Sequence, residues 1–481
     1  MNAKLYRAAI PLMATGMLIC PAIALSMEFP YIFSDPLHAV PAVIQKGVIL
    51  PGDSTPIPRL VQKDFSQPLT LAEAVDLALS NNPKIKGAWA EIKVQSGILG
   101  QVKAAYLPSI NGSANWTYDD LNYPNESSST TRYTGQASVN WRLFDFGGRS
   151  ANLSAAENQL ATALASYDAT LQESLAEVIQ GYFDTITAAA ALKAKTEDEG
   201  IAKSTLQSAK DREAKGTTSR SDTLRATTAL AKATLDKNRA TGDYQKALAV
   251  LTRYLGLPGN TQLLIPSDMQ EHRKGALETR ELALWLEDAQ KNHPAIVAAR
   301  KSLEATKDGV IVTRSAGLPT VNLSGNYYNN TRQGVAATQK SAQETTVMLS
   351  LNIPLFDGFA STYKLRGAQA DVEKEAATLA DTEQKIAMGI IRAFAETTSS
   401  LRNLEASATL LESAQSALAS SQRRYDKGAA DIIELLSTQA ALADAWHERI
   451  RCLAEWNSAR LQLLANSGKM GRFAVTDSAA D

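Results

Sequence analysis

The sequence has few of the residues that build disulfides and metal sites. Only two of its 481 residues are cysteines. Cys20 lies in a segment that we expect to be removed, so Cys452 is left without a partner for an internal disulfide. The four histidines are scattered and lack the spacing of metal ligands; they are His38, His272, His293 and His447. We therefore expect no metal and no cofactor.

Charge and hydropathy exclude further classes of protein. The net charge is −1, from 49 basic and 50 acidic residues, so no overall field favours binding of nucleic acid. Beyond residue 26 no apolar run reaches 18 residues, so we expect no membrane-spanning helix and any membrane part must be non-helical. No nucleophile–base pairing or phosphate-cradling loop indicates an enzyme.

The first 24 residues have the pattern of an export signal. Lys4 and Arg7 form a basic start, the stretch 8–25 is mostly apolar, and Ala22-Ile23-Ala24 fits the small-x-small cleavage pattern. Ile19 occupies the place where a small residue is expected before a lipidated cysteine, which argues against a lipoprotein. The mature chain is therefore expected to be exported.

The segments at the two ends of the remaining chain lack helical or strand periodicity. Residues 25–68 are rich in proline and are interpreted as an extended arm or linker without an assigned function. Residues 468–481 are expected to form a flexible tail.

Between these segments the sequence is internally duplicated. Short motifs recur in the same order 211 residues later (294 − 83) or, further along, 212 residues later (427 − 215). They are Asn81-Asn82-Pro83 and Asn292-His293-Pro294, Leu107-Pro108 and Leu318-Pro319, Leu143-Phe144-Asp145 and Leu355-Phe356-Asp357, and Lys215-Gly216 and Lys427-Gly428. A register held over such a span predicts one architecture built twice, at 69–257 and 281–467, joined by a connection at 258–280.

Each copy begins with a helical stretch, which a Leu-Pro pair stops, followed by two segments of alternating apolar and polar residues. The helical stretches are 71–105 and 281–315. Alternation such as Val347, Leu349 and Leu351 predicts strands with one apolar face, at about 109–118, 133–144, 320–329 and 344–356. Segments of about ten residues match the span of a tilted strand in a membrane.

Each copy ends in a hairpin of two long helices. They are expected at about 148–213 and 219–255 in the first copy and about 360–427 and 431–464 in the second. Apolar residues recur at sevenfold spacing, as in the series Leu365, Val372, Leu379 and Ile386, which is typical of helices packed side by side as in a coiled coil. A helix of this length makes a rod of about 100 Å.

Four amphipathic strands cannot close a barrel alone. Unpaired backbone groups cannot face lipid, so a membrane sheet must close, and membrane barrels begin at about eight strands. Several chains must therefore pool their strands, and the long helices would be pooled with them. Such a tube is best explained as a conduit.

The repeated Asn-x-Pro, the Leu-Pro before each strand pair, the Leu-Phe-Asp that ends each pair and the Lys-Gly turns resemble the TolC family of bacterial outer-membrane efflux proteins. The resemblance covers about residues 69–467. It implies a mainly α-helical protein with a membrane β-barrel. Four strands per protomer would form a trimeric, twelve-stranded barrel in the outer membrane, continuous with a long α-helical barrel across the periplasm. It also implies a homotrimer in contact with outer-membrane lipid, a periplasmic adaptor and an inner-membrane transporter.

The resemblance also places a gate at the periplasmic entrance. Ser221 and Asp222 would lie on one side of a link that holds the entrance shut, and Tyr425 on the other. Glu434 would belong to a ring of negative charge there. Asp222 and Glu434 also fit capping boxes at the starts of the returning helices, and the two roles can coexist.

The sequence departs from the family pattern at two gate positions. Ala430 stands where an arginine is expected, and Ser437 stands where a second entrance acid is expected. The closed state would then be held more weakly or by other residues, with Arg220, Arg423 and Arg424 as candidates.

The turns between the long helices match the adaptor-contact loops of the family. Their residues are Lys215, Gly216 and Thr217 in the first copy and Lys427, Gly428 and Ala429 in the second. The alternative is a plain glycine stop after a helix.

Two alternatives to a drug-efflux duct stay open on the sequence. Within the same family the cargo could be a protein exported by type I secretion. From a different class, a periplasmic coiled-coil adaptor also carries helical hairpins, although a duplicated pair of membrane-type strands is not expected of it.

Overall fold

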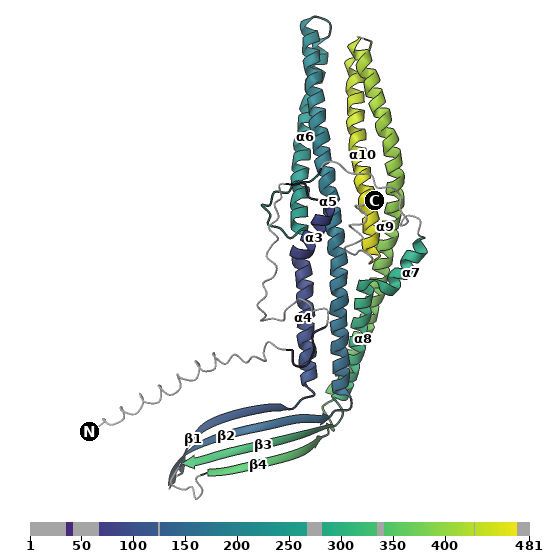
Figure 1. The fold of residues 1–481 in the computed structure, drawn as a ribbon. Helices are drawn as coiled ribbons and strands as arrows, with labels where there is room; N and C mark the ends of the chain where they lie inside the picture. The colour runs from purple at the N-terminus through teal and green to yellow at the C-terminus, as the bar shows by residue number, and fades with distance from the viewer. Residues whose placement is uncertain are drawn as a thin grey trace, which may run out of the picture.

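The computed structural model describes residues 35–41, 67–123, 126–266, 281–333, 341–427 and 429–468. The expected export signal, Gly428, and most of the arm, of the inter-repeat connection and of the tail lie outside the described residues. The described part is a long layer of helices with a sheet at one end (Figure 1).

The same order of elements occurs twice. The first repeat contains α3 (Leu71–Asn81), α4 (Pro83–Ala104), β1 (Ser109–Tyr123), β2 (Glu126–Phe144), α5 (Gly148–Ala214) and α6 (Arg220–Tyr254). The second contains α7 (Leu282–Asn292), α8 (Pro294–Ser315), β3 (Thr320–Gln333), β4 (Ser341–Asn352), α9 (Ala360–Asp426) and α10 (Ile432–Asn466). Corresponding helices have equal lengths, which agrees with the duplication read from the sequence.

The first helical stretch of each repeat is broken into two helices. The stretches expected at 71–105 and at 281–315 are helical, but each is interrupted, because Asn82 and His293 adopt extended backbone and cap the following helix. The side chain of Asn82 accepts from the N–H of Lys84 at 2.9 Å, and Nδ1 of His293 accepts from the N–H of Ala295 at 3.2 Å. The proline after each cap is the first residue of the next helix, where its missing N–H costs nothing.

The four strands form one antiparallel sheet in the order β1-β2-β3-β4. β1 and β2 pair from Ser109↔Asn140 to Tyr123↔Glu126, so both continue through the polar stretch at 119–132 that the alternation assigned to a loop. β4 ends at Asn352 and not at residue 356, because Pro354 has no N–H to donate to the ladder. Within the described chain, β1 and β4 are each paired along one side.

The two faces of the sheet differ in polarity. Residues directly opposite one another share a face, and one such row joins Trp141, Leu323 and Leu349. The row Asn111, Ser138, Asn326 and Thr346 lies on the other face. Val347, Leu349 and Leu351 of the apolar face are more than 60% exposed in the single chain. Among the aromatic residues of the strands, Trp116, Trp141, Tyr118 and Tyr327 lie on the apolar face, whereas Tyr328 lies on the polar face.

The long helices α5 and α9 run through the whole helical layer, with 67 residues each. In the half next to the sheet, α5 packs against α4 and α8; in the other half it packs against α6 and α10 (Figure 1). The largest apolar core lies where these halves meet and includes Trp285 of α7 and Tyr182 of α5. Among the described residues no helix has both the length and the apolarity needed to cross a bilayer.

Candidate gate at the hairpin tips

The turn between α5 and α6 is built by backbone hydrogen bonds and a left-handed glycine. Gly216 has φ 71°, and the N–H groups of Gly216 and Thr217 donate to the carbonyls of Glu213 and Arg212, both at 2.9 Å. Glycine is favoured here because a side chain would strain this backbone conformation. A Cβ at Gly216 would meet no atom within 4 Å, so no other part of the described chain covers the turn at this position.

The capping box expected at Asp222 is present. The hydroxyl of Ser219 accepts from the N–H of Asp222 at 3.3 Å, and the carboxylate of Asp222 accepts from the N–H of Ser219 and the hydroxyl of Thr218. The Thr218 hydroxyl, 2.7 Å away, is the main cause of the lowered pKa of Asp222. Ser221 is exposed on the same turn of helix. The carboxylate of Asp222 is therefore engaged within its own hairpin.

The second hairpin starts its returning helix differently. The side chain of Asp431 accepts from the N–H of Glu434 at 2.8 Å, but the carboxylate of Glu434 turns to Arg424 at 2.7 Å. The reciprocal half of the capping box expected at Glu434 is thus replaced by an ion pair across the turn. Arg424 also donates to the carbonyl of Ala429, and Lys427 is exposed. The pairing with Arg424 offsets the charge that Glu434 would bring to an acidic ring.

Tyr425 lies in the contact between the two hairpins and is only 5% exposed. The guanidinium of Arg212, at the end of α5, stacks over the Tyr425 ring at 4.2 Å and donates to its carbonyl oxygen at 3.2 Å. Among the described residues no hydrogen bond joins Tyr425 to Ser221 or Asp222 within one chain. Arg212 is the partner that sequence reasoning missed, since it lies 213 residues away with no motif that pairs it with Tyr425.

The surroundings of Tyr425 are apolar and span the tips of both hairpins. They comprise Leu206, Ala209, Ala226, Ile432 and Leu435, with Ala430 packed at the edge. Ala430 therefore contributes packing where the family pattern expects an arginine. A groove of about 490 Å³ borders Tyr425 between α5, α9 and α10.

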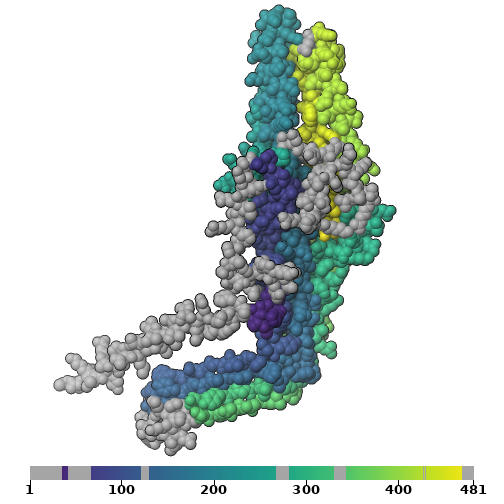
Figure 2. Space-filling model, in the orientation of Figure 1, coloured from purple at the N-terminus to yellow at the C-terminus, as the bar shows by residue number. Residues whose placement is uncertain are grey.

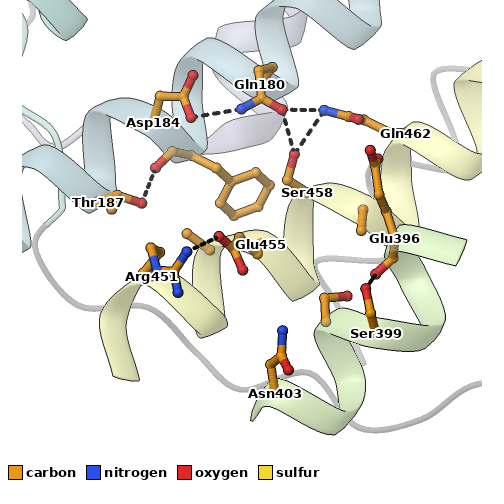
Figure 3. A pocket seen from close by; sticks show the side chains of 14 residues that line it. Gln180, Asp184, Thr187, Glu396, Ser399, Asn403, Arg451, Glu455, Ser458 and Gln462 are labelled. Carbon is orange, nitrogen blue, oxygen red and sulfur yellow. Dashed lines mark hydrogen bonds and ion pairs between the residues drawn. The ribbon is translucent and has the colours of Figure 1, made fainter. Parts of the chain in front are cut away.

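A second groove, of about 390 Å³, lies at mid-length between α5, α9 and α10 (Figure 3). The amide of Gln180 donates to Asp184 at 2.7 Å, while its oxygen accepts from Ser458 and Gln462 on α10. Burial raises the pKa of Asp184. These bonds join a helix of the first repeat to a helix of the second, so the hairpins are fastened at mid-length as well as at the tip.

This combination of an amphipathic sheet, paired long hairpins and duplicated repeats occurs in known proteins. A family model described as outer membrane efflux protein matches residues 74–257 and 285–469, which correspond to the two repeats. The chain belongs to the outer membrane efflux protein family.

Individual relatives cover nearly the whole chain. It is 35% identical to protein CyaE of Bordetella pertussis over 431 residues, which cover 89% of this chain and 90% of CyaE. It is 24% identical to outer membrane protein TolC of Vibrio cholerae, with coverage of 85% and 92%. The CmeC outer membrane channel of Campylobacter jejuni has a similar fold, with a TM-score of 0.76 at 16% identity and coverage of 90% and 97%.

Family membership confirms the resemblance read from the sequence motifs. The protein is an outer-membrane channel that forms the exit duct of an efflux or type I secretion system, with a helical part that extends into the periplasm. It is not an enzyme, and nothing supports the alternative of a periplasmic adaptor.

Proposed function

We propose that three copies of this chain form a closed duct. The duct would be gated at the hairpin tips, and a periplasmic adaptor would bind at these tips. The observation that carries this proposal is the four-stranded sheet, which has one apolar face and two open edges, β1 and β4. Pairing β4 of one copy with β1 of the next would remove both edges, and three copies would give twelve strands. The apolar face would then contact outer-membrane lipid.

The helical layer supplies the tunnel below this barrel. Gln180 and Asp184 lie on the side of α5 opposite Val178 and Tyr182, which pack in the core with α3 and α7. Because a helix turns 100° per residue, positions two apart point in nearly opposite directions. With α3 and α7 on the outside, the polar groove of Figure 3 would face the lumen.

The gate would depend on Tyr425 and Arg212, with Ser221, Asp222 and Glu434 around the entrance. The stacking of Arg212 on Tyr425 fixes the tips of the two hairpins to each other, so the tips of a subunit would move together until this contact breaks. The turns at Lys215–Thr217 and Lys427–Ala429, in which Lys215, Lys427 and Ala429 are exposed, would be the contacts for a periplasmic adaptor. The adaptor would connect the duct to an inner-membrane transporter.

The test is conductance in planar lipid bilayers, with the mass of the purified oligomer measured alongside. We expect a trimer with discrete channels. A soluble monomer without channel activity would contradict the proposal.

The gate is tested separately with Arg212→Met, which keeps an apolar stem but loses the cation. A cation–π contact is worth about 1 kcal/mol, so the open population should rise about fivefold. Lys210→Met is the matched control, since Lys210 is an exposed cation near the same end of α5 and has no assigned part in the gate. Tyr425→Phe should change little, because the ring face and the carbonyl are retained. Equal conductance of Arg212→Met and Lys210→Met would remove Arg212 from the gate.

A further inference from the structure

The arm segment at residues 35–41 occupies a built site on the helical layer. It lies against α4 and α5 near the end of α4 that adjoins the sheet; its atoms form the small purple patch in Figure 2. Ala39 is 6% exposed and packs with Ile92, Leu99 and Leu160. The arm therefore completes an apolar cluster between two helices.

Polar contacts fix the segment in place. The ammonium of Lys103, in the last turn of α4, donates to the carbonyls of Leu37 at 3.2 Å and His38 at 2.9 Å. The carboxylate of Asp35 accepts from the N–H groups of Ala39 at 2.9 Å and Val40 at 3.0 Å. The turn is thus closed on itself by Asp35 and tied to α4 by Lys103.

The second repeat carries larger side chains at the corresponding place. Gly100 of α4 lies beneath Ala39, and its counterpart in α8, at the same distance from the initial proline, is Ile311. Ala163 of α5 corresponds to Glu375 of α9, which accepts from the hydroxyl of Ser302 at 3.2 Å. The arm site therefore belongs to the first repeat.

The two corresponding helices, α4 in the first repeat and α8 in the second, have different neighbours. α8 packs against both α5 and α9, whereas α4 packs along α5 and lies at the edge of the layer. Val94 and Ile98 of α4 are 53% and 39% exposed in the single chain. Because α4 lies at the edge, fewer contacts within the chain hold it in place. Its exposed apolar surface would be covered by a neighbouring subunit.

We propose that residues 35–41 are a strap that holds the edge helix α4 on α5, so that α4 presents a fixed surface to the next subunit. The inference rests on the proposed trimer. It assigns a role to the arm: by packing on α4 and α5, the strap replaces the packing that α8 obtains from its second neighbouring helix, α9.

Docking of the strap can be tested by cross-linking in the full-length protein. A Cβ built on Gly100 lies 3.5 Å from the Cβ of Ala39, at the short end of disulfide geometry. The pair Ala39→Cys and Gly100→Cys should therefore oxidise readily. The matched control is Ala39→Cys with Gly97→Cys, since a Cβ at Gly97 has no atom within 4 Å. Failure of the first pair, or equal oxidation of both, would overturn the docking.

The role of the strap is tested by Lys103→Met, with Arg314→Met as the control at the corresponding position of α8. We expect Lys103→Met to lower the Tm of the trimer by about 2–4 °C and Arg314→Met to leave it unchanged. The oxidised 39–100 cross-link should restore the Tm of Lys103→Met. Equal Tm values for wild type and Lys103→Met would overturn the strap. A wild-type protein that is not trimeric would instead overturn the proposed function, and the cross-link would still form.

Discussion

The strand-to-helix junctions of the two repeats share the Leu-Phe-Asp motif but are fastened differently. Asp145 is 8% exposed and accepts from the backbone N–H of Arg149 at 3.2 Å and from its Nε at 3.0 Å. Arg149 then donates to the carbonyls of Arg142 at 2.7 Å and Leu143 at 3.0 Å. Asp357 is exposed and accepts from the N–H of Ser361 at 2.8 Å. The backbone turn has been retained in both copies, while the side-chain clamp occurs in the first.

The positions of the two junctions in the sheet account for this difference. β2 is paired on both sides, so its junction with α5 is enclosed within one subunit. β4 is an edge strand, and Leu355 and Phe356 after it are 91% and 76% exposed. In the proposed trimer the second junction would adjoin the next copy, which would supply the contacts that Arg149 supplies in the first. Duplicated elements can thus keep one backbone and differ in how they are held.

The largest loss of stability is expected from removing the side chain of Arg149, which forms the clamp at the first junction. Arg149→Ala would leave the carboxylate of Asp145 buried without its charged partner, and breaking such a pair costs about 3 kcal/mol. Circular dichroism during thermal or denaturant unfolding of the purified protein would measure the loss.

Ser361→Ala is the control in the second repeat. The carboxylate of Asp357 accepts from the backbone N–H of Ser361, which alanine also provides. We expect a change of less than about 0.5 kcal/mol. Similar losses in the two variants would show that the junctions are fastened alike and would contradict the comparison.

The sequence was sufficient for the duplicated architecture, because strand alternation and heptads each reflect which face of an element is apolar. It was not sufficient for the ends of the strands, since polar residues at 119–132 pair through their backbone without any apolar signal. It also did not reveal the break at Asn82, although the Asn-Pro pair carries that signal.

The candidate site was predictable only in part. Motif positions located the turns and the capping box at Asp222, which depend on residues close in the chain. The contact of Arg212 with Tyr425 joins residues from different repeats and depends on how the hairpins pack. The pairing of Glu434 with Arg424 depends on the geometry of the turn between them.

The second prediction concerns Asn82 and His293, which cap the corresponding helices α4 and α8 of the two repeats. Burial lowers the pKa of His293, whose Nδ1 must be unprotonated to accept from Ala295. The unfolded chain therefore binds the proton more tightly, and stability is full above the ordinary pKa of about 6.5 and falls as the pH drops below it. Once His293 is protonated the cap is lost, at a cost of about 1 kcal/mol.

His293→Asn should remove this part of the pH dependence and make the second repeat resemble the first. The measurement is the Tm at a series of pH values between about 5 and 8, which brackets the ordinary histidine pKa. Asn82→His, the reverse exchange in the first repeat, should introduce a similar dependence. A pH profile unchanged by His293→Asn would show that the two caps are equivalent.

The smallest expected loss of stability concerns the starts of the two returning helices, α6 and α10. Asp222→Ala removes half of a capping box and should cost about 0.5–1 kcal/mol, whereas Glu434→Ala removes an exposed ion pair and should cost less than about 0.5 kcal/mol. Because hydrogen bonds lower the pKa of Asp222, its contribution is present above the ordinary value of about 3.9 and is lost as the pH falls through the lowered value. Raised salt should weaken the contribution of Glu434 more than that of Asp222, because hydrogen bonds hold the Asp222 carboxylate and its ion pair with Arg225 is longer, at 3.6 Å. If salt reduced both contributions equally, the starts of α6 and α10 would be held by the same kind of interaction, and the two hairpins would not differ in this respect.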